Sequence, residues 1–262
     1  MLVAIDVGNS HTVIGLYEGS KLICHWRVST VAERTADEHG VLLNALATGS
    51  GLGVPLRPAG VVVACVVPAL NQVMEDLARH FLGCEPLIVG PGIRTGMPIL
   101  YENPKEVGAD RIVNAVAAYN RFGSACIVVD FGTATTFDYV SEPGEYLGGA
   151  IAPGLGISME ALVEHAAKLY RVELIRPREA IGRTTIAAIQ SGLVFGYSAL
   201  VDGLVRRIRR ERGEPARVIA TGGLASLIAH EAETIEEVDE FLTLKGLRLI
   251  FERNQALAGR GS

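Results

Sequence analysis

The chain has 262 residues, of which 49% are hydrophobic and 20% are charged, a balance typical of a globular protein with a well-buried core. Its formal net charge is −5 and its isoelectric point is near 5.7, which argues against a nucleic-acid-binding protein that works through a broad basic surface. The four cysteines match no metal-binding spacing, so we expect free thiols in a reducing, cytoplasmic environment.

The first half of the chain predicts a mixed sheet with helices packed against it. Apolar runs, a Gly-Ser hairpin turn and helical periodicity give the order strand, strand, strand, helix, strand, helix, strand. The expected strands are residues 2–5, 12–17, 21–27, 61–67 and 86–89, and the expected helices are residues 36–47 and 70–81. Residues 90–107, rich in proline and glycine, then form an extended connector.

The second half repeats this plan after an alanine-rich helix that ends near residue 120. Expected strands are residues 125–129, 135–140, 146–151 and 217–221, and expected helices are residues 157–169, 185–210 and a segment ending near 230. Residues 242–253 suggest a short strand or turn followed by a helix. We therefore expect a duplicated α/β fold with two domains, residues 1–120 and 121–262, and an active site in the cleft between them.

No span across a membrane is expected. The chain opens in a strand, without the charged segment and apolar core of a secretory leader, and no apolar run reaches the roughly 18 residues that a membrane helix needs. These patterns predict a cytoplasmic protein with no membrane partner and no nucleic-acid partner.

One signature occurs twice, once in each half. Asp6-Val7-Gly8 follows the first apolar strand, and Asp130-Phe131-Gly132 follows the strand at residues 125–129. A strand that ends in such a turn can present a carboxylate and backbone N–H groups to bound phosphate or to its metal ion. Two such turns indicate two similar lobes that close on one nucleotide.

In the first turn, Asp6 can hold Mg²⁺ directly or through water, and Gly8 lets phosphate approach the backbone. Four residues then supply hydrogen-bond donors for the same phosphates: Asn9, Ser10, His11 and Thr12. An ordinary Asx-turn would explain one such turn taken alone, but the second copy favours nucleotide binding.

Asp110 and Arg111 lie at the expected start of the alanine-rich helix. Asp110 could cap that helix, or it could be the general base that phosphoryl transfer to a hydroxyl requires. Arg111 could bind a carboxylate on the acceptor or neutralise charge in the transition state.

Three further features have two readings each. Gly222-Gly223 could admit an adenine or ribose, or simply form a strand-to-helix turn. Thr184 and Thr185 precede a long helix, where one caps it and a hydroxyl could also contact substrate. Gly192 and Gly196 clear one face of that helix for a close neighbour, either in the same chain or across a dimer axis.

Taken together, these strings resemble type III pantothenate kinase, a family of the acetate and sugar kinase, Hsp70 and actin superfamily. The resemblance runs nearly end to end. Besides the two turns, it rests on Gly108-Ala109-Asp110-Arg111, on the Gly-Gly-Ala-Ile-Ala-Pro-Gly string at residues 148–154, and on Thr221-Gly222-Gly223.

The resemblance implies a fold and an activity. The fold is a pair of actin-like (ribonuclease H-like) lobes, each a mixed five-stranded sheet flanked by helices. The activity is ATP-dependent phosphorylation of pantothenate to 4′-phosphopantothenate, the first step of coenzyme A synthesis, by a homodimer that uses Mg²⁺ and a monovalent cation, K⁺ or NH₄⁺.

The resemblance also implies a role for each site residue. The ATP phosphates would be bound by Asp6, Val7, Gly8, Asn9, Ser10, His11, Thr12 and Val13, and Thr133 would contact ATP. Asp110 would accept the proton, and Asp130 would hold the monovalent cation. Pantothenate would be bound by Tyr101, Gly108, Ala109, Asp110, Arg111 and Thr185.

Two other functions stay open at this stage: a regulatory protein that keeps the fold without turnover, and a kinase for another small hydroxylated acid or sugar. The presence of all four residues favours an enzyme over a relative that has lost its activity: Asp6, Asp110, Arg111 and Asp130.

Overall fold

The computed structural model describes residues 1–165 and 171–258, and contacts divide the chain into two compact units. Unit 1 contains Met1–Met97, Glu102–Ala117 and the C-terminal segment that begins at Thr243. Unit 2 contains Pro98–Tyr101 and the segment from Ala118 to Leu242. These units are not consecutive halves of the chain, and the domain boundary expected between residues 120 and 121 stays a prediction.

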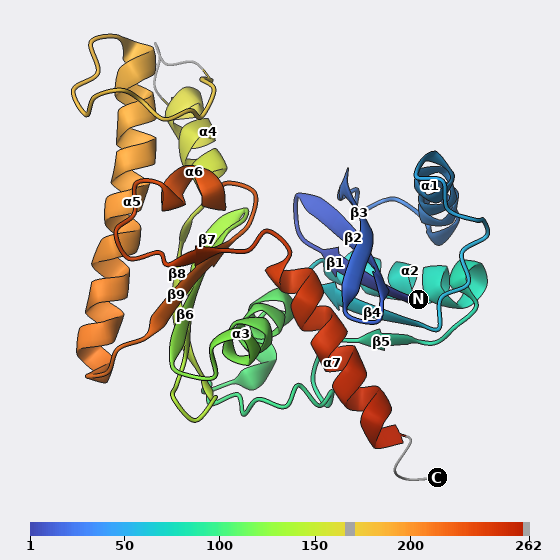
Figure 1. The fold of residues 1–262 in the computed structure, drawn as a ribbon. Coiled ribbons are helices and arrows are strands. Elements are labelled where there is room, and N and C mark those ends of the chain that lie inside the picture. The colour runs from blue at the N-terminus through green and yellow to red at the C-terminus, as the bar shows by residue number, and fades with distance from the viewer. Residues whose placement is uncertain (166–170, 259–262) are drawn as a thin grey trace. The chain divides into compact units, whose positions relative to one another are not determined.

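The sheet of unit 1 has five strands in the order β3-β2-β1-β4-β5 (Figure 1). The three N-terminal strands pair antiparallel, whereas β4 and β5 run parallel to β1. The strands are β1 (Leu2–Val7), β2 (His11–Glu18), β3 (Lys21–Ser29), β4 (Gly60–Cys65) and β5 (Pro86–Ile88). Every residue of β1 except Asp6 is buried, as the continuous apolar run predicts for a central strand.

The sheet of unit 2 has the same topology, in the order β10-β9-β6-β7-β8. Here β6, β7 and β8 pair antiparallel, and β9 and β10 are parallel to β6. The strands are β6 (Cys126–Phe131), β7 (Ala134–Val140), β8 (Tyr146–Pro153), β9 (Arg217–Thr221) and β10 (Glu237–Val238). The duplicated plan, with one mixed five-stranded sheet in each half, is thereby confirmed.

Short helices cover one face of the sheet in unit 1. They are α1 (Ala36–Gly49), η1 (Pro68–Leu70), α2 (Asn71–Asp76) and the π-helical turn η2 (Leu77–Leu82). Thr35 and Glu38 form a capping box that begins α1. Leu43 of α1 and Met74 of α2 pack into one buried cluster with alternate residues of β1, which face the same side of the sheet.

The last helix, α7 (Leu242–Ala258), belongs to unit 1 from Thr243 onward. Leu244, Leu247 and Ile250 are buried, as the 3.6-residue period of an amphipathic helix predicts. The Thr243 hydroxyl donates a hydrogen bond to Asn114 Oδ1 at 2.8 Å in α3 (Ala109–Phe122), which begins in unit 1. The C-terminal helix therefore supplies part of the interior of the unit formed by the N-terminal strands.

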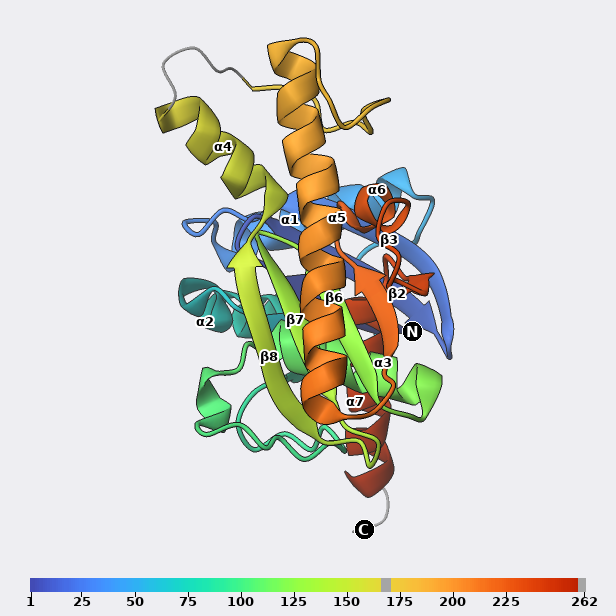
Figure 2. The ribbon, with the colours of Figure 1, turned by 90° about the vertical axis from the view of Figure 1, so that its left-hand side faces the viewer.

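In unit 2, three helices lie on one face of the sheet: α4 (Leu155–His165), α5 (Thr185–Arg212) and α6 (Ala225–Ala229). The long helix α5 crosses that face, as Figure 2 shows. Leu193, Val201 and Val205 of α5 share a buried cluster with Ile127 and Val129 of β6. This shared core makes α5 an integral layer of the unit.

Among the described residues, α5 is the one helix with the length and apolar composition to cross a membrane. However, 56% of its most apolar window is buried inside the fold. Packing against the sheet of unit 2 thus accounts for its apolar character.

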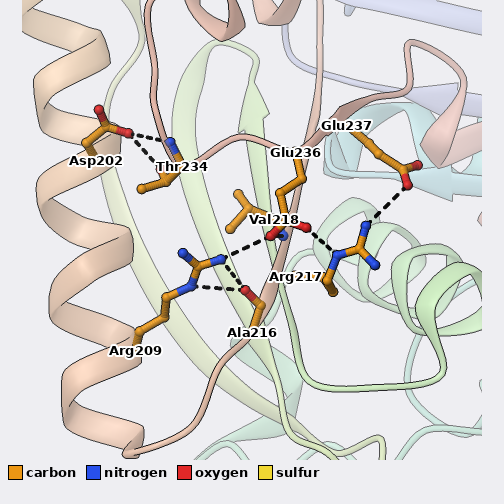
Figure 3. A network of polar contacts seen from close by, with 8 residues as sticks. All are labelled: Asp202, Arg209, Ala216, Arg217, Val218, Thr234, Glu236 and Glu237. Atoms are coloured by element: carbon orange, nitrogen blue, oxygen red, sulfur yellow. Dashed lines mark hydrogen bonds and ion pairs between the residues drawn. The ribbon is translucent and has the colours of Figure 1, made fainter.

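Polar contacts tie α5 to the segment between α6 and β10 (Figure 3). The Asp202 carboxylate accepts hydrogen bonds from the backbone N–H of Thr234 at 2.9 Å and from its hydroxyl at 2.7 Å. Further along the helix, Arg209 donates to Glu236 at 3.1 Å. Glu236 also pairs with Arg217, at the start of β9. These contacts hold the connection between β9 and β10 against the helix.

One face of α5 is open in the described part of the chain. Gly192 and Gly196 are both exposed, and a Cβ atom at either would meet nothing within 4 Å. Of the two expected neighbours of these glycines, a helix of the same chain is therefore not found among the described residues.

Three expected elements differ from the structure. The helix expected at residues 70–81 is divided into η1, α2 and η2. The helix expected at residues 157–169 begins earlier, at Leu155, and the end expected for it lies outside the described residues. The short strand or turn expected near residue 242 is instead the beginning of α7, a continuous helix that extends to Ala258.

Candidate active site

The first turn joins β1 to β2 in unit 1. Asp6 lies one residue before the end of β1 and pairs with Val13 of β2 and Ala64 of β4. The Gly8 N–H donates to the His11 carbonyl at 3.0 Å, which closes the turn. Asn9, Ser10 and His11 are exposed. The turn thus presents an acidic group and several polar groups beside one another, as the sequence predicts.

Thr12 differs from the other expected donors because its side chain is 1% exposed. Its hydroxyl lies 2.9 Å from the hydroxyl of Thr30, which donates its own proton to the Gly8 carbonyl at 2.8 Å. A hydroxyl has one proton to donate, so the Thr12 hydroxyl is the donor to Thr30. In this arrangement the Thr12 side chain holds the turn together instead of facing outward.

Asp110 lies in the first turn of α3, at the second residue of the helix rather than at the cap position before it. Its Oδ1 accepts a hydrogen bond from the backbone N–H of Arg111 at 2.8 Å, so it still satisfies one of the free N–H groups of the helix terminus. Burial raises the pKa of the Asp110 carboxyl, and the Arg111 N–H and guanidinium partly oppose this shift. The ionised carboxylate is therefore held in an environment that favours its protonation.

Val66 links the first turn to the segment that carries Asp110. The Val66 N–H donates to the Val7 carbonyl at 3.0 Å, which continues the pairing of β4 with β1. A Cβ atom at Gly108 would lie 3.8 Å from Val66 Cγ1 and 2.5 Å from Asp110 Oδ1. The structure thus brings the Gly108–Arg111 string to the same end of the sheet as the Asp6 turn.

Cys65 lies beside this group, opposite Val7 in the sheet. Burial raises the pKa of its thiol, a hydrogen bond with the Val67 backbone opposes the rise, and the nearby Asp6 carboxylate adds to it. The thiol is therefore kept protonated beside the acidic turn.

The second turn joins β6 to β7 in unit 2. Asp130 occupies the same place in its strand as Asp6, and it pairs with Thr136 of β7 and Thr221 of β9. Gly222, which follows β9, has a φ of +93°, and a Cβ atom there would lie 2.6 Å from Asp130 Oδ1. Close approach to the second turn is therefore the reason for glycine at this position. Thr133 is exposed at the tip of the turn.

Tyr101 is held on unit 2 by a short stretch of backbone pairing. The Tyr146 N–H donates to the Pro98 carbonyl and the Leu100 N–H donates to the Tyr146 carbonyl, each at 2.9 Å. The Tyr101 and Tyr146 rings lie 6.4 Å apart, and the Tyr146 hydroxyl donates to the fully buried Asp138 at 2.7 Å. The sequence indicated only a loop here, and the pairing with β8 was not predicted.

Thr185 is the exposed first residue of α5, and Thr184 caps the helix by accepting the Ala187 N–H at 3.1 Å. The expected capping role thus falls on Thr184, and the Thr185 side chain is exposed at the helix start.

Within the described residues, no group of three or more His, Cys, Asp or Glu side chains could form a metal cage. Mg²⁺ does not need one, because it commonly binds through one or two carboxylates together with substrate phosphates. A single strand-end carboxylate such as Asp6 fits that mode, with the remaining ligands supplied by phosphate and water.

Solved structures define the class of fold. The protein is similar to a conserved putative Baf family transcriptional activator from Campylobacter jejuni, with a TM-score of 0.61 at 18% identity over 97% of this chain and 99% of that one. It is also similar to a putative 2-dehydro-3-deoxygalactonokinase from Sinorhizobium meliloti, with a TM-score of 0.59 at 12% identity over 97% and 96%. At these identities the likeness concerns the fold alone, which is the actin-like fold of the sugar kinases.

The sequence comparisons are more specific. A family model described as type III pantothenate kinase matches residues 2–207. Curated proteins of that name from Myxococcus xanthus and Geobacter sulfurreducens are each 56% identical to this chain. These matches cover 98% and 97% of this chain, respectively, and all of each relative. The chain belongs to the type III pantothenate kinase family, as its motifs predict.

Proposed function

We propose that this protein transfers the γ-phosphoryl group of ATP to the primary hydroxyl of pantothenate, with Asp110 as general base. The single observation that carries the activity is the 56% identity to proteins named type III pantothenate kinase over their whole length. The product, 4′-phosphopantothenate, is that of the first step of coenzyme A synthesis.

In this proposal the pantothenate hydroxyl gives its proton to the Asp110 carboxylate as its oxygen attacks the γ-phosphorus. The bond from that phosphorus to the bridging oxygen breaks in line, and ADP leaves. A base works best when its pKa approaches the working pH. The burial that raises the pKa of Asp110 supports this role, as does the adjacent Arg111, which is 9% exposed.

The first turn is proposed to bind the ATP phosphates, with Asp6 directed to the associated Mg²⁺. Support comes from the exposed polar residues Asn9, Ser10 and His11 beside a strand-end carboxylate. Mg²⁺, when bound, would neutralise charge that develops on the transferring phosphate. The Gly108–Arg111 string, at the same end of the sheet, is proposed to bind the acceptor.

In unit 2, Asp130 is proposed to hold a monovalent cation, K⁺ or NH₄⁺, and Thr133 to contact ATP. Tyr101 and Thr185 are proposed to bind pantothenate. The pairing of residues 98–100 with β8 supports the role of Tyr101, because it fixes the backbone just before Tyr101, whose ring lies 6.4 Å from that of Tyr146.

A coupled assay for ADP tests the activity against a panel of hydroxylated acids and sugars, with Mg²⁺ and either K⁺ or Na⁺. We expect turnover that requires pantothenate and is faster in K⁺. ADP formation with a sugar and not with pantothenate would overturn the substrate. If no acceptor gives ADP, the proposed kinase activity is wrong. Equal rates in K⁺ and Na⁺ would overturn the proposed role of the monovalent cation.

We also propose a cytoplasmic homodimer that uses the open face of α5. Gly192→Leu and Gly196→Leu should leave each protomer folded, because neither side chain would meet another described atom of the chain within 4 Å at its Cβ. Both should shift the mass measured by light scattering from dimer to monomer, whereas Gly49→Leu, at another open helical glycine, should not. A wild-type monomer, or leucine variants that stay dimeric, would contradict this interface.

A further inference from the structure

Thr30 contacts the first turn at three points although it lies outside that turn. It follows the last residue of β3. Its hydroxyl donates to the Gly8 carbonyl at 2.8 Å and accepts from the Thr12 hydroxyl at 2.9 Å, and its backbone N–H donates to the Ser10 carbonyl at 3.0 Å. One residue therefore contacts the beginning, the tip and the end of the turn.

These contacts determine which way the peptide groups of the turn face. The carbonyls of Gly8 and Ser10 are directed toward Thr30. In a planar trans peptide the N–H points opposite to the carbonyl, so the N–H groups of the next residues, Asn9 and His11, are turned away from Thr30. N–H groups held in this way form the kind of concave donor set that binds anions.

The second turn offers an internal comparison. His11 pairs with Ser29, and its counterpart Ala134 pairs with Pro153, so Thr30 and Gly154 occupy equivalent positions one residue further along. A Cβ atom at Gly154 would lie 2.2 Å from the Thr133 carbonyl oxygen, so no side chain fits there. The first turn leaves room at this position, and the Thr30 hydroxyl fills it with hydrogen bonds.

We propose that Thr30 is a positioning residue for ATP, which holds the backbone of the first turn in the conformation that binds phosphate. This inference rests on the proposed function, since it assigns the ATP phosphates to that turn. It concerns the hydroxyl alone, because the hydrogen bond from the Thr30 N–H to Ser10 does not depend on the side chain.

The decisive variant is Thr30→Val, which keeps the shape of the side chain and removes its hydroxyl. Thr30→Ser retains the hydroxyl, and Thr48→Val is the matched control, since its hydroxyl also donates to a backbone carbonyl of unit 1, that of Asn44 at 2.8 Å in α1. Steady-state assays would give kcat and the KM values for Mg·ATP and pantothenate. Hydrogen exchange would report on the turn amides without ligand.

For Thr30→Val we expect the KM for Mg·ATP to rise about tenfold, the scale of one lost hydrogen bond that orients a binding group. The KM for pantothenate should stay within about twofold, as expected when a change is confined to the ATP side of the site. Exchange of the amides of residues 8–12 should increase while that of β1 does not. Thr30→Ser and Thr48→Val should resemble the wild type.

Three outcomes separate this inference from the proposed function. An unchanged KM for Mg·ATP in a folded, active Thr30→Val protein would overturn the role of Thr30 and leave the kinase assignment intact. A loss of stability with equal rises in both KM values would show a merely structural threonine and would also overturn it. If the wild type binds Mg·ATP but does not phosphorylate pantothenate, weaker Mg·ATP binding in Thr30→Val would support the positioning role although the proposed function fails.

Discussion

The two aspartate turns have the same strand topology around them but differ in length and in what holds them. The last ladder pairs before the turns are Val7 with Thr12 in unit 1 and Phe131 with Thr135 in unit 2, so the first turn is one residue longer. A hydroxyl from Thr30 contacts the first turn, whereas bare glycine backbone approaches the second at Gly154 and Gly222.

This difference shows that two copies of one motif can differ in the room that each leaves for a neighbouring side chain. The longer turn exposes Asn9 and Ser10 and has room for a side chain behind it. The shorter turn is crowded, and its carboxylate lies against the backbone of Gly222. We infer two different tasks: a flexible anion, the triphosphate, for the first turn, and a small cation beside Asp130 for the second.

The largest expected effect lies outside both turns, at Asp110. Asp110→Asn should lower kcat by about 10²- to 10⁴-fold, the usual contribution of a general base, with Mg·ATP binding retained. Coupled turnover and equilibrium binding would check this, with Asp76→Asn in α2 as a control on a helical aspartate of unit 1. Near-normal turnover would show that a residue of one of the turns, or no residue, accepts the proton.

The pH dependence of kcat/KM should reveal the same group. Asp110 must be ionised to accept a proton, so the rate should fall about tenfold per pH unit below its pKa, which burial places above the usual 3.8. A raised pKa in the folded state also means that protonation stabilises the fold, and this stabilisation is lost as the pH rises through that pKa. Asp110→Asn should therefore remove the acid limb without lowering the melting temperature at neutral pH. A limb that persists in this variant would belong to another group.

The two turn carboxylates should fail in different ways. Asp6→Asn should raise the KM for Mg·ATP about tenfold or more, with K⁺ activation unchanged, on the scale reported for removing groups that support a bound metal. Asp130→Asn should instead weaken activation by K⁺. Titrations of Mg·ATP and of K⁺ on both variants would check this. Identical profiles for the two variants would contradict the assignment of Mg·ATP to the first turn and of K⁺ to the second.

The smallest effects are those on folding stability, where one substitution can be compared in both turns. Gly222→Ala should lower the free energy of unfolding by about 2–3 kcal/mol, because it combines a positive φ with a clash against Phe131 and Asp130. Gly8→Ala should cost about 1 kcal/mol or less, since its Cβ would approach only the His11 carbonyl, at 3.0 Å, without a positive φ. Urea unfolding would measure both, and equal losses would show that the turns are equally crowded.

Much of the fold was predictable because its signals are local. The buried strand before Asp6 and its counterpart before Asp130 are short apolar runs that end in Asp-x-Gly, and the structure has both as central strands. The family was predicted from the resemblance of several short strings, such as Gly108–Arg111, and the sequence comparisons confirm it. The prediction of a strand or turn at the start of α7 was wrong. Gly246 lowers the helix propensity of this segment, and packing in the folded protein compensates for that loss.

The features of the site that the sequence did not predict depend on contacts between segments far apart in the chain. Nothing near Thr30 in the sequence marks it, because its importance comes from Gly8 and Thr12, which are 22 and 18 residues away. The raised pKa of Asp110 likewise depends on how deeply the start of α3 is buried. The pairing of residues 98–100 with Tyr146 joins a loop to a strand more than 40 residues later, and no short-range periodicity reports it.

The placement of α7 in unit 1 has a consequence for the order in which the chain can fold during synthesis. The strands of unit 1 leave the ribosome first, but the helix that contributes Leu244, Leu247 and Ile250 to their interior is among the last segments made. Unit 2 is fully translated once Leu242, its last residue, has been made. Domains generally fold as units while synthesis proceeds. The unit that is begun first is therefore completed last, and a nascent chain that ends at residue 242 contains all of unit 2 but lacks the last segment of unit 1.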